Sequence, residues 1–305
     1  MTMQRNFLLL VILLAAVATP ALGQPLPKAS AETATSGAAS IPDFSGIWWH
    51  PFLPGMEPLA SGPTSLRNRS RRNGVSNYDR LVGDYTNPIL QPWASDVVRK
   101  FGELSEAGVT YPSPANQCWP EPLPYIYKNT ALMVLQQPHE ITMVYNHEFR
   151  KVRMDEPHPA KVTPSWHGDA VGHYEGDTLV VDTVGQKHGP FAMLDLYGTP
   201  YSEKLHVVER YRLLDYEEAK DGLERNAKEN MRAGGASEID RNYRGKHLQV
   251  LFTVDDVNVF TMPWSATITY VRGSNEWRES VCAENTHDYL SNKDVEVPTA
   301  DVPDF

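Results

Sequence analysis

The chain lacks the defining features of several large protein classes. Basic residues are in deficit, because 28 Lys and Arg stand against 38 Asp and Glu, and this argues against a nucleic-acid binder. No internal apolar run is long enough to span a bilayer. Gly-rich phosphate loops and the G-x-S-x-G, C-x-x-C and H-E-x-x-H motifs are absent. The sequence therefore gives no support to dinucleotide binding or to nucleophilic serine catalysis.

The composition that is present suits a globular protein of one large or two small domains, with 41% hydrophobic and 22% charged residues in 305. Its N-terminus has the pattern of a signal peptide: Arg5, the apolar run Phe7–Val17, then Ala21-Leu22-Gly23. We expect residues 1–23 to be removed, giving a periplasmic or secreted protein with no membrane insertion. A retained anchor is the alternative, for which the run is short. Residues 24–41, rich in Pro, Ala, Ser and Thr, are expected to form a flexible linker.

Only two cysteines are present, Cys118 and Cys282. Export to an oxidising compartment favours a disulfide between them. The alternatives are two buried free thiols or one reactive thiol.

The body of the chain is β-rich. A loop and helix segment is expected over 42–130. It begins with a short strand at 44–49 and contains a helix from Pro92 to about Ala107. Alternating runs separated by turn residues then predict strands at Leu132–Gln136, Glu140–Tyr145, Phe149–Met154, Val171–Glu175, Thr178–Val184, Leu205–Leu214, His247–Val254 and Trp264–Arg272. This spacing is typical of an antiparallel meander that closes into an all-β, lipocalin-like barrel, with a β-sandwich as the alternative. The barrel domain is expected over 131–290, with a helical insertion at 216–246 and a C-terminal tail at 291–305.

The segment Ser165–Thr183 carries the most chemistry. Its turn at 175–177 predicts a hairpin in which His167, Asp169, His173 and Asp182 share one face. Two imidazoles and two carboxylates can supply a general base with its orienting partner. They can also supply a divalent transition-metal site made of His167, His173 and Asp169. The third interpretation is a solvated polar face over a core formed by the other side of the hairpin.

Glu209 lies in an otherwise apolar row of its predicted strand, so it needs a partner or a proton. Arg210 and Arg212 lie on the opposite face and cannot serve it. Either an Arg of a neighbouring strand pairs with it, or it is an inward carboxylate in a barrel cavity. Residues that would line such a cavity are Trp264, Tyr270, Tyr211 and, at its mouth, His188; core packing and a plain surface histidine are the alternatives. His158 lies between two prolines, which predicts a rigid loop and nothing more.

Four motifs, DFSGIW, WHGDAVGHYEGDTLVVDT, LHVVERYRLLD and FTMPW, resemble a widespread group of exported bacterial proteins of undetermined activity. The resemblance covers about residues 43–290 without the insertion. The chain departs from the group at His167 and His173, which indicates a specialised activity. The strand pattern is also similar to lipocalin-like barrels, some of which house hydratases and isomerases acting on apolar substrates.

These observations predict an exported enzyme that performs acid–base chemistry, as a lyase, hydratase or isomerase, on a small, partly apolar substrate in the barrel. His173 would be the base or acid, Asp182 its orienting partner and Glu209 the second proton-transfer group, with His167 nearby. A metal-dependent hydrolase or oxidoreductase and a non-catalytic periplasmic ligand-binding protein are the alternatives.

Overall fold

The computed structural model describes residues 41–229, 240, 242–273, 277, 282, 287–288 and 293–294. All of them belong to one compact unit, Ala39–Phe305. The expected signal peptide (1–23) therefore lies outside the described residues, as do nearly all of the linker (24–41) and of the tail (291–305).

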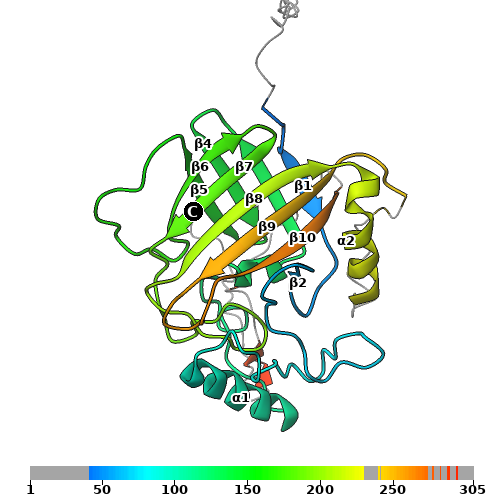
Figure 1. Ribbon diagram of the computed structural model, residues 1–305, viewed down its shortest axis with the longest axis vertical. Coiled ribbons are helices and arrows are strands. Elements are labelled where there is room, and N and C mark those ends of the chain that lie inside the picture. The colour runs from blue at the N-terminus through cyan, green and yellow to red at the C-terminus, as the bar shows by residue number, and fades with distance from the viewer. Residues whose placement is uncertain are drawn as a thin grey trace, which may run out of the picture. The chain divides into compact units, whose positions relative to one another are not determined.

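Nine strands close into a barrel, because β1 pairs with β3 on one side and with β10 on the other. Around the barrel these strands are β1 (Gly46–Trp49), β3 (Ala131–Gln136), β4 (Glu140–Tyr145), β5 (Glu148–Met154), β6 (Asp169–Glu175), β7 (Thr178–Val184), β8 (His206–Leu214), β9 (His247–Asp255) and β10 (Trp264–Arg272). The short β2 (Glu57–Pro58) adds to β10, and β11 (His287–Asp288) pairs with β12 (Lys293–Asp294). Figure 1 shows the strands crossing obliquely around the barrel. The expected lipocalin-like all-β barrel is confirmed.

Alternation of side chains explains why these segments form the wall. Along β4 and β9 every second residue is buried, as expected for strands with one face toward a core and the other toward the outside. The observed bounds of β4, β7 and β10 equal those expected from the sequence.

One strand pair departs from the expected meander. β5 and β6 pair in parallel, through Arg153 with Val171 and Met154 with Gly172, whereas the other barrel pairs are antiparallel. The connecting segment, 155–168, contains three prolines, which cannot donate to a ladder of backbone hydrogen bonds. The chain therefore leaves the sheet after β5 and re-enters it in the same direction.

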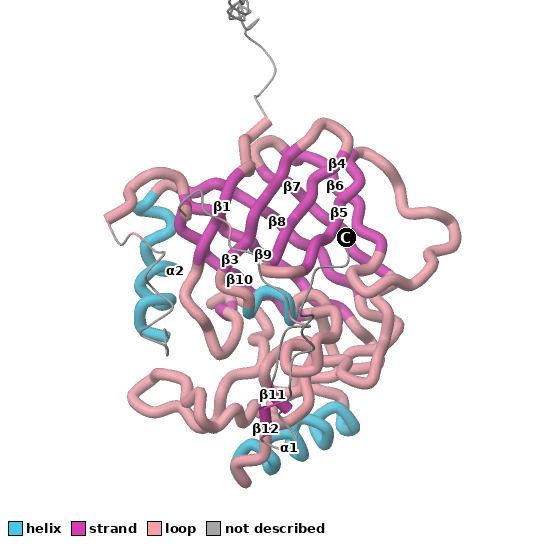
Figure 2. The backbone as a smooth tube through the Cα atoms, turned by 180° about the vertical axis from the view of Figure 1, so that it is seen from behind, coloured by secondary structure: helices cyan, strands magenta, loops and turns pink. Residues whose placement is uncertain are grey.

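Loops and two helices cover one end of the barrel. α1 (Pro92–Glu106) confirms the helix expected from Pro92, and η1 (Tyr125–Lys128) is a 3-10 helix that leads into β3. Figures 1 and 2 show α1 at the lower end of the molecule, below the strands. The backbone amide of Gln91 donates to Val259 in the loop between β9 and β10, which joins this covering segment to the barrel. We call this side the capped end.

The insertion between β8 and β9 forms α2 (Tyr216–Glu229), which lies against the outer wall. Asn226 donates to the Thr269 carbonyl of β10 at 2.8 Å, and Gly222 allows the helix to approach the same residue closely. Residues 230–239 and 241 of the expected insertion lie outside the described residues.

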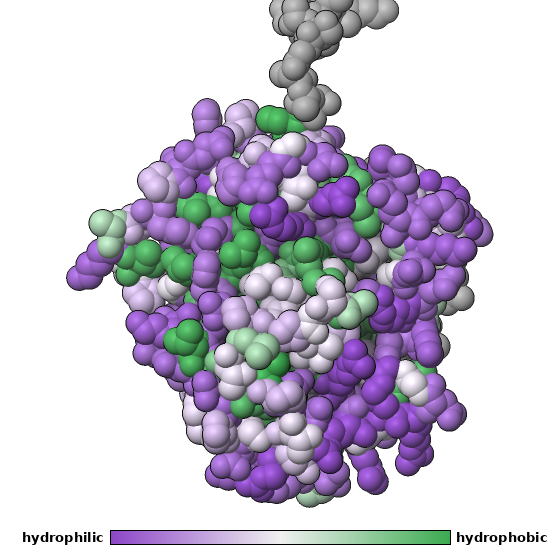
Figure 3. Space-filling model, in the orientation of Figure 1, coloured by the Kyte–Doolittle hydropathy of each residue, from purple (hydrophilic) through white to green (hydrophobic). Residues whose placement is uncertain are grey.

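Cys118 and Cys282 form the expected disulfide. None of the described helices has the length and apolar character needed to cross a membrane. The face shown in Figure 3 is mostly hydrophilic, with smaller hydrophobic patches between the polar side chains.

Candidate functional site

An ion pair lies at the centre of the barrel. Arg150 of β5 and Glu209 of β8 are both fully buried, and their side chains meet at 2.8 Å (Nη1–Oε1) and 2.5 Å (Nη2–Oε2). Arg150 also donates to the Thr183 hydroxyl at 2.8 Å. Glu209 thus points inward, as one of the two expectations required. Its partner is an Arg of β5, which β6 and β7 separate from β8 in the sheet, rather than an Arg of a neighbouring strand.

Tyrosines complete this interior network. The hydroxyls of Tyr127 and Tyr211 both donate to Glu209, the second at 2.6 Å. Burial raises the pKa of both phenols well above the usual value, and the charge of Glu209 adds to the rise. They therefore remain neutral donors, and the two oxygens of Glu209 receive a set of hydrogen bonds that suits a carboxylate.

A second cluster lies where β5 begins, at the capped end. Glu148 precedes Arg150 by two residues and so shares its inward face. Both oxygens of Glu148 accept the backbone amide of Glu121, at 2.9 and 3.1 Å, and Oε2 lies 3.1 Å from Nε2 of His167. The other ring nitrogen of His167, Nδ1, is buried and has no hydrogen-bond partner among the described residues. Glu148 therefore favours the tautomer protonated at Nε2, which leaves the lone pair on Nδ1.

A neighbouring carboxylate belongs to the same cluster. The ammonium of Lys128 lies 2.7 Å from Oε1 of Glu121, and the side-chain amide of Asn129 donates to Oε2 at 2.7 Å. Burial raises the pKa of Glu121, and the negative charge of Glu148 contributes in the same direction. Because Lys128 and Tyr127 are adjacent in η1, this short helix joins the end cluster to the interior network.

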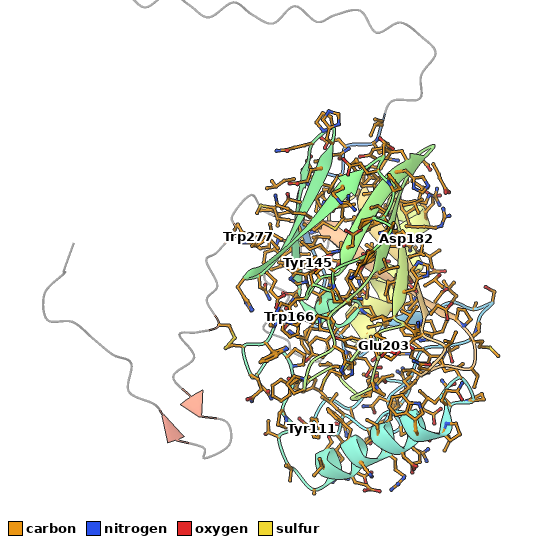
Figure 4. The ribbon with its side chains drawn as sticks, turned by 90° about the vertical axis from the view of Figure 1, so that its left-hand side faces the viewer. Tyr111, Tyr145, Trp166, Asp182, Glu203 and Trp277 are labelled. Carbon is orange, nitrogen blue, oxygen red and sulfur yellow. A yellow bond between two sulfur atoms is a disulfide. The ribbon has the colours of Figure 1, made fainter. Side chains whose placement is uncertain are left out.

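Aromatic side chains stand beside His167. Trp166 packs edge-on against Trp119 at 5.2 Å, and Trp119 packs against Phe191 at 5.6 Å. The ammonium of Lys187 lies 4.6 Å from the centre of the Trp166 ring. In Figure 4, Trp166 lies between the level of Tyr145 in the barrel and that of Tyr111 beside α1. The residue that precedes His167 in the chain therefore belongs to an aromatic cluster that also binds a cation.

His167, Asp169, His173 and Asp182, which the sequence predicts on one face, do not form a single cluster. His173 is exposed and lies 3.2 Å from Glu175, which in turn binds Arg210. Asp182 shares the outer face of the wall with His173, as expected, but its partners are His206 and His158. Because alternate residues of a strand point to opposite sides, this outer pair is separated by the barrel wall from the inward Glu209. The expected trio of His173, Asp182 and Glu209 therefore does not meet.

The expected metal ligands do not converge either. His167 turns to Glu148, His173 to Glu175, and Asp169 to Arg153 and His158. Within the described ranges, no group of three or more His, Cys, Asp or Glu side chains is arranged to hold a metal ion.

The residues expected to line a cavity are mostly core residues. Trp264 packs against Phe252 and Phe260, and Tyr211 belongs to the interior network. Tyr270 is buried, packs edge-on against His50 at 4.8 Å and has a hydroxyl without a described partner. His188 is exposed and lies against Tyr201.

A groove of about 920 Å³ lies outside the barrel, between α2, the segment Leu53–Ala60 and the loop around Arg71. Ion pairs between Arg71 and Glu229 and between Arg225 and Glu57 cross it. A small pocket of about 20 Å³ that reaches Tyr127 shares the wall Leu53–Met56 with the groove. This segment therefore separates the groove from the interior network.

Sequence reasoning missed Arg150, Tyr127, Glu148 and His158. β5 reads Glu-Phe-Arg-Lys-Val-Arg-Met, with charges on both faces, so its alternation did not show which charges are inside. The signal that could have indicated His158 was its position just before the hairpin that carries the carboxylates Asp169 and Asp182.

Comparisons with known proteins do not add to this description. No protein-family model, no curated protein and no solved structure matches the chain.

Proposed function

We propose that the protein is an exported enzyme that carries out acid–base chemistry, as a lyase, hydratase or isomerase, on a small, partly apolar molecule at the capped end of the barrel. His167 is the base through Nδ1, and Glu148 is the residue that orients it. One observation carries the proposal: Glu148 holds Nε2 of His167 at 3.1 Å while Nδ1 has no described partner. This is the arrangement of an imidazole prepared to accept a proton.

The surroundings support this assignment. When Nδ1 takes a proton from the substrate, the positive charge of the ring is balanced by the nearby carboxylate of Glu148. Glu148 is fixed by the Glu121 amide. Trp119 and Trp166 supply apolar surface for a substrate with little charge. An isomerase would return the proton to another carbon, and a dehydratase would remove it while a hydroxyl group leaves.

The test follows proton abstraction directly. The protein is incubated in D₂O with a panel of small apolar ketones, enones and hydroxy compounds, and mass spectrometry detects deuterium uptake, isomers, and gain or loss of water. We expect at least one compound to react. We expect the rate to fall about 100-fold or more in His167→Asn, since a positioned acid–base group contributes on that order.

Two further variants complete the design. Glu148→Gln should also slow the reaction, because the amide no longer balances the imidazolium charge. His173→Gln is the matched control, since His173 is exposed and contacts Glu175 on the outer face. A reaction that proceeds equally well in His167→Asn would overturn the assignment, as would a panel in which compounds bind and none reacts.

Ligand binding without turnover is the second candidate, and the groove beside α2 favours it, because a volume of about 920 Å³ is in the range of small-molecule sites. Met56→Trp would fill part of this groove. Thermal shifts induced by panel compounds that disappear in Met56→Trp, persist in His167→Asn and accompany no reaction would support this candidate instead.

A further inference from the structure

A row of acidic and basic side chains lies on the outer wall of the barrel, and His167 is not part of it. Its centre is His158, from the segment between β5 and β6. Nδ1 of His158 lies 2.6 Å from Oδ1 of Asp169, and Nε2 lies 3.1 Å from Oδ1 of Asp182. Asp169 belongs to β6 and Asp182 to β7, so one imidazole connects the segment to two strands. Figure 4 shows Asp182 farther from α1 than Trp166 is.

The number of protons on the ring decides whether both contacts are attractive. A neutral imidazole has one N–H and one lone pair, so it can donate to only one of the two carboxylates. Its lone pair would then face the other carboxylate. Both contacts are hydrogen bonds only when the ring carries two protons and a positive charge.

The charged groups around His158 act on that state in opposite directions: the carboxylates of Asp169 and Asp182 favour a positive ring, and the basic groups bound to them oppose it. Arg153 of β5 binds both oxygens of Asp169, at 2.8 and 3.1 Å, and also contacts Glu156. His206 of β8 lies 3.0 Å from the same Asp182 oxygen that His158 contacts.

Asp182 keeps its negative charge at neutral pH. A hydrogen bond from His206, and a further one from His158, lower the pKa of Asp182. The same contact raises the pKa of His206, to which Asp255 of β9 contributes. Asp182 is therefore an anion over the whole range in which histidine titrates.

The segment has few other attachments. In the part of the chain that the structure describes, residues 157–164 make no hydrogen bonds other than the two of His158. Beyond them, Ser165 is fixed to Gly185 and Lys187 by backbone hydrogen bonds, and Trp166 and His167 follow. His158 therefore provides the polar attachment of a segment that leads straight to the base.

We propose that His158 is a pH-dependent clamp: when protonated it holds residues 157–164 against β6 and β7, and when it loses a proton it releases them. Nδ1 of His167 is buried in the clamped conformation. Release of the preceding segment is thus a route by which rising pH opens this side of the site. That consequence rests on the proposed function, whereas the clamp itself does not.

Hydrogen exchange of backbone amides tests the clamp without a substrate. Exchange is measured by mass spectrometry from about pH 5 to about pH 8, the range in which histidine titrates, and is corrected for the intrinsic rate. Peptides from β4 serve as the internal reference. The amides of Asp155, Ser165 and Gly168 are hydrogen-bonded at the two ends of the segment and report its release. We expect their protection to fall about tenfold across this range, which corresponds to about 1.4 kcal/mol in the free energy of opening.

Three variants decide the outcome. In His158→Gln the amides of Asp155, Ser165 and Gly168 should be weakly protected at every pH, because glutamine does not titrate. In Asp182→Asn the midpoint should move to lower pH, because the anion that favours the protonated ring is gone; a merely structural contact would not move it. His173→Gln, which removes an exposed histidine of the same wall, should behave as the wild type.

The clamp is overturned if the protection of the Asp155, Ser165 and Gly168 amides does not depend on pH, or if His158→Gln retains the wild-type dependence. Failure of the clamp is distinguishable from failure of the proposed function. If exchange depends on pH as expected and no compound of the panel reacts, the clamp is supported and the proposed enzymatic function is overturned. If turnover depends on His167 and exchange does not depend on pH, the enzymatic function is supported and the clamp is overturned.

Discussion

At the residue scale, the interior of the barrel holds charged and neutral polar groups side by side. Arg150 remains charged although it is buried: burial disfavours the charge, but the attraction and the hydrogen bonds of Glu209 together raise its pKa. His50 is buried next to Tyr270, and no carboxylate of the described residues pairs with it. Burial lowers the pKa of His50 to about 4, so its ring remains neutral at neutral pH.

His50 gives a prediction with a defined sign. Its ordinary pKa is 6.5 and its folded value is about 4, so between these values the unfolded chain binds the extra proton. Stability should therefore fall as the pH drops through this window, by roughly 3 kcal/mol for this group. Denaturant unfolding at a series of pH values measures it. His50→Phe should flatten the dependence, His173→Gln should keep it, and an unchanged slope in His50→Phe would refute the explanation.

At the element scale, the hairpin of β6 and β7 shows what a glycine contributes at each end. Gly176 forms the turn with a φ of +62°, and a Cβ atom there would meet open space. Gly168 enters β6 with a φ of +73°, but a Cβ atom there would lie 2.7 Å from the Val184 carbonyl oxygen. The first position needs only the backbone conformation, and the second needs the conformation and the absence of a side chain.

The two glycines form a matched pair of variants. Gly176→Ala should cost about 1–2 kcal/mol of unfolding free energy, the usual penalty of a left-handed backbone for an L-residue. Gly168→Ala should cost clearly more and should also displace the adjacent His167 from Glu148. Chemical denaturation of both variants measures the difference. Equal costs would mean that β6 can shift to accommodate the new methyl group.

The element scale also shows how far local pattern reaches. The bounds of β4, β7 and β10 and the start of α1 follow from alternation and from Pro92, which are local properties. The parallel pairing of β5 with β6 could not be predicted in this way, because strand direction depends on the path of residues 155–168 through space. Sequence periodicity shows which residues of a strand share a face. It does not show which residues they meet across the barrel.

At the scale of the whole molecule, the disulfide joins the covering segment before β3 to the chain after β10. Cys118 and Cys282 are separated by 164 positions, so the bond closes a loop that contains almost the entire barrel. A crosslink of this length restricts the unfolded chain strongly.

The double variant Cys118→Ser/Cys282→Ser should therefore lose about 2–4 kcal/mol of unfolding free energy with little change in strand content. Denaturant titration followed by circular dichroism measures both quantities. Reduction of the wild type should produce the same loss, and reductant should not affect the variant further. Identical unfolding of oxidised and reduced wild type would show that the bond does not stabilise the barrel.

The sequence by itself determined the strand-forming segments and the face of its strand on which Glu209 lies, because each depends on spacing along the chain. It favoured a disulfide between the two cysteines over free thiols, and the structure shows that bond. Only the tertiary structure decided that Arg150 is the partner of Glu209, that Glu148 holds His167 and that His158 reaches Asp182. The reason is geometric. Arg150 and Glu209 lie on separate strands of the barrel, and His158 and His167 lie on the segment that connects β5 to β6. A spacing of two along one strand contains no information about which residue of another strand or segment it meets.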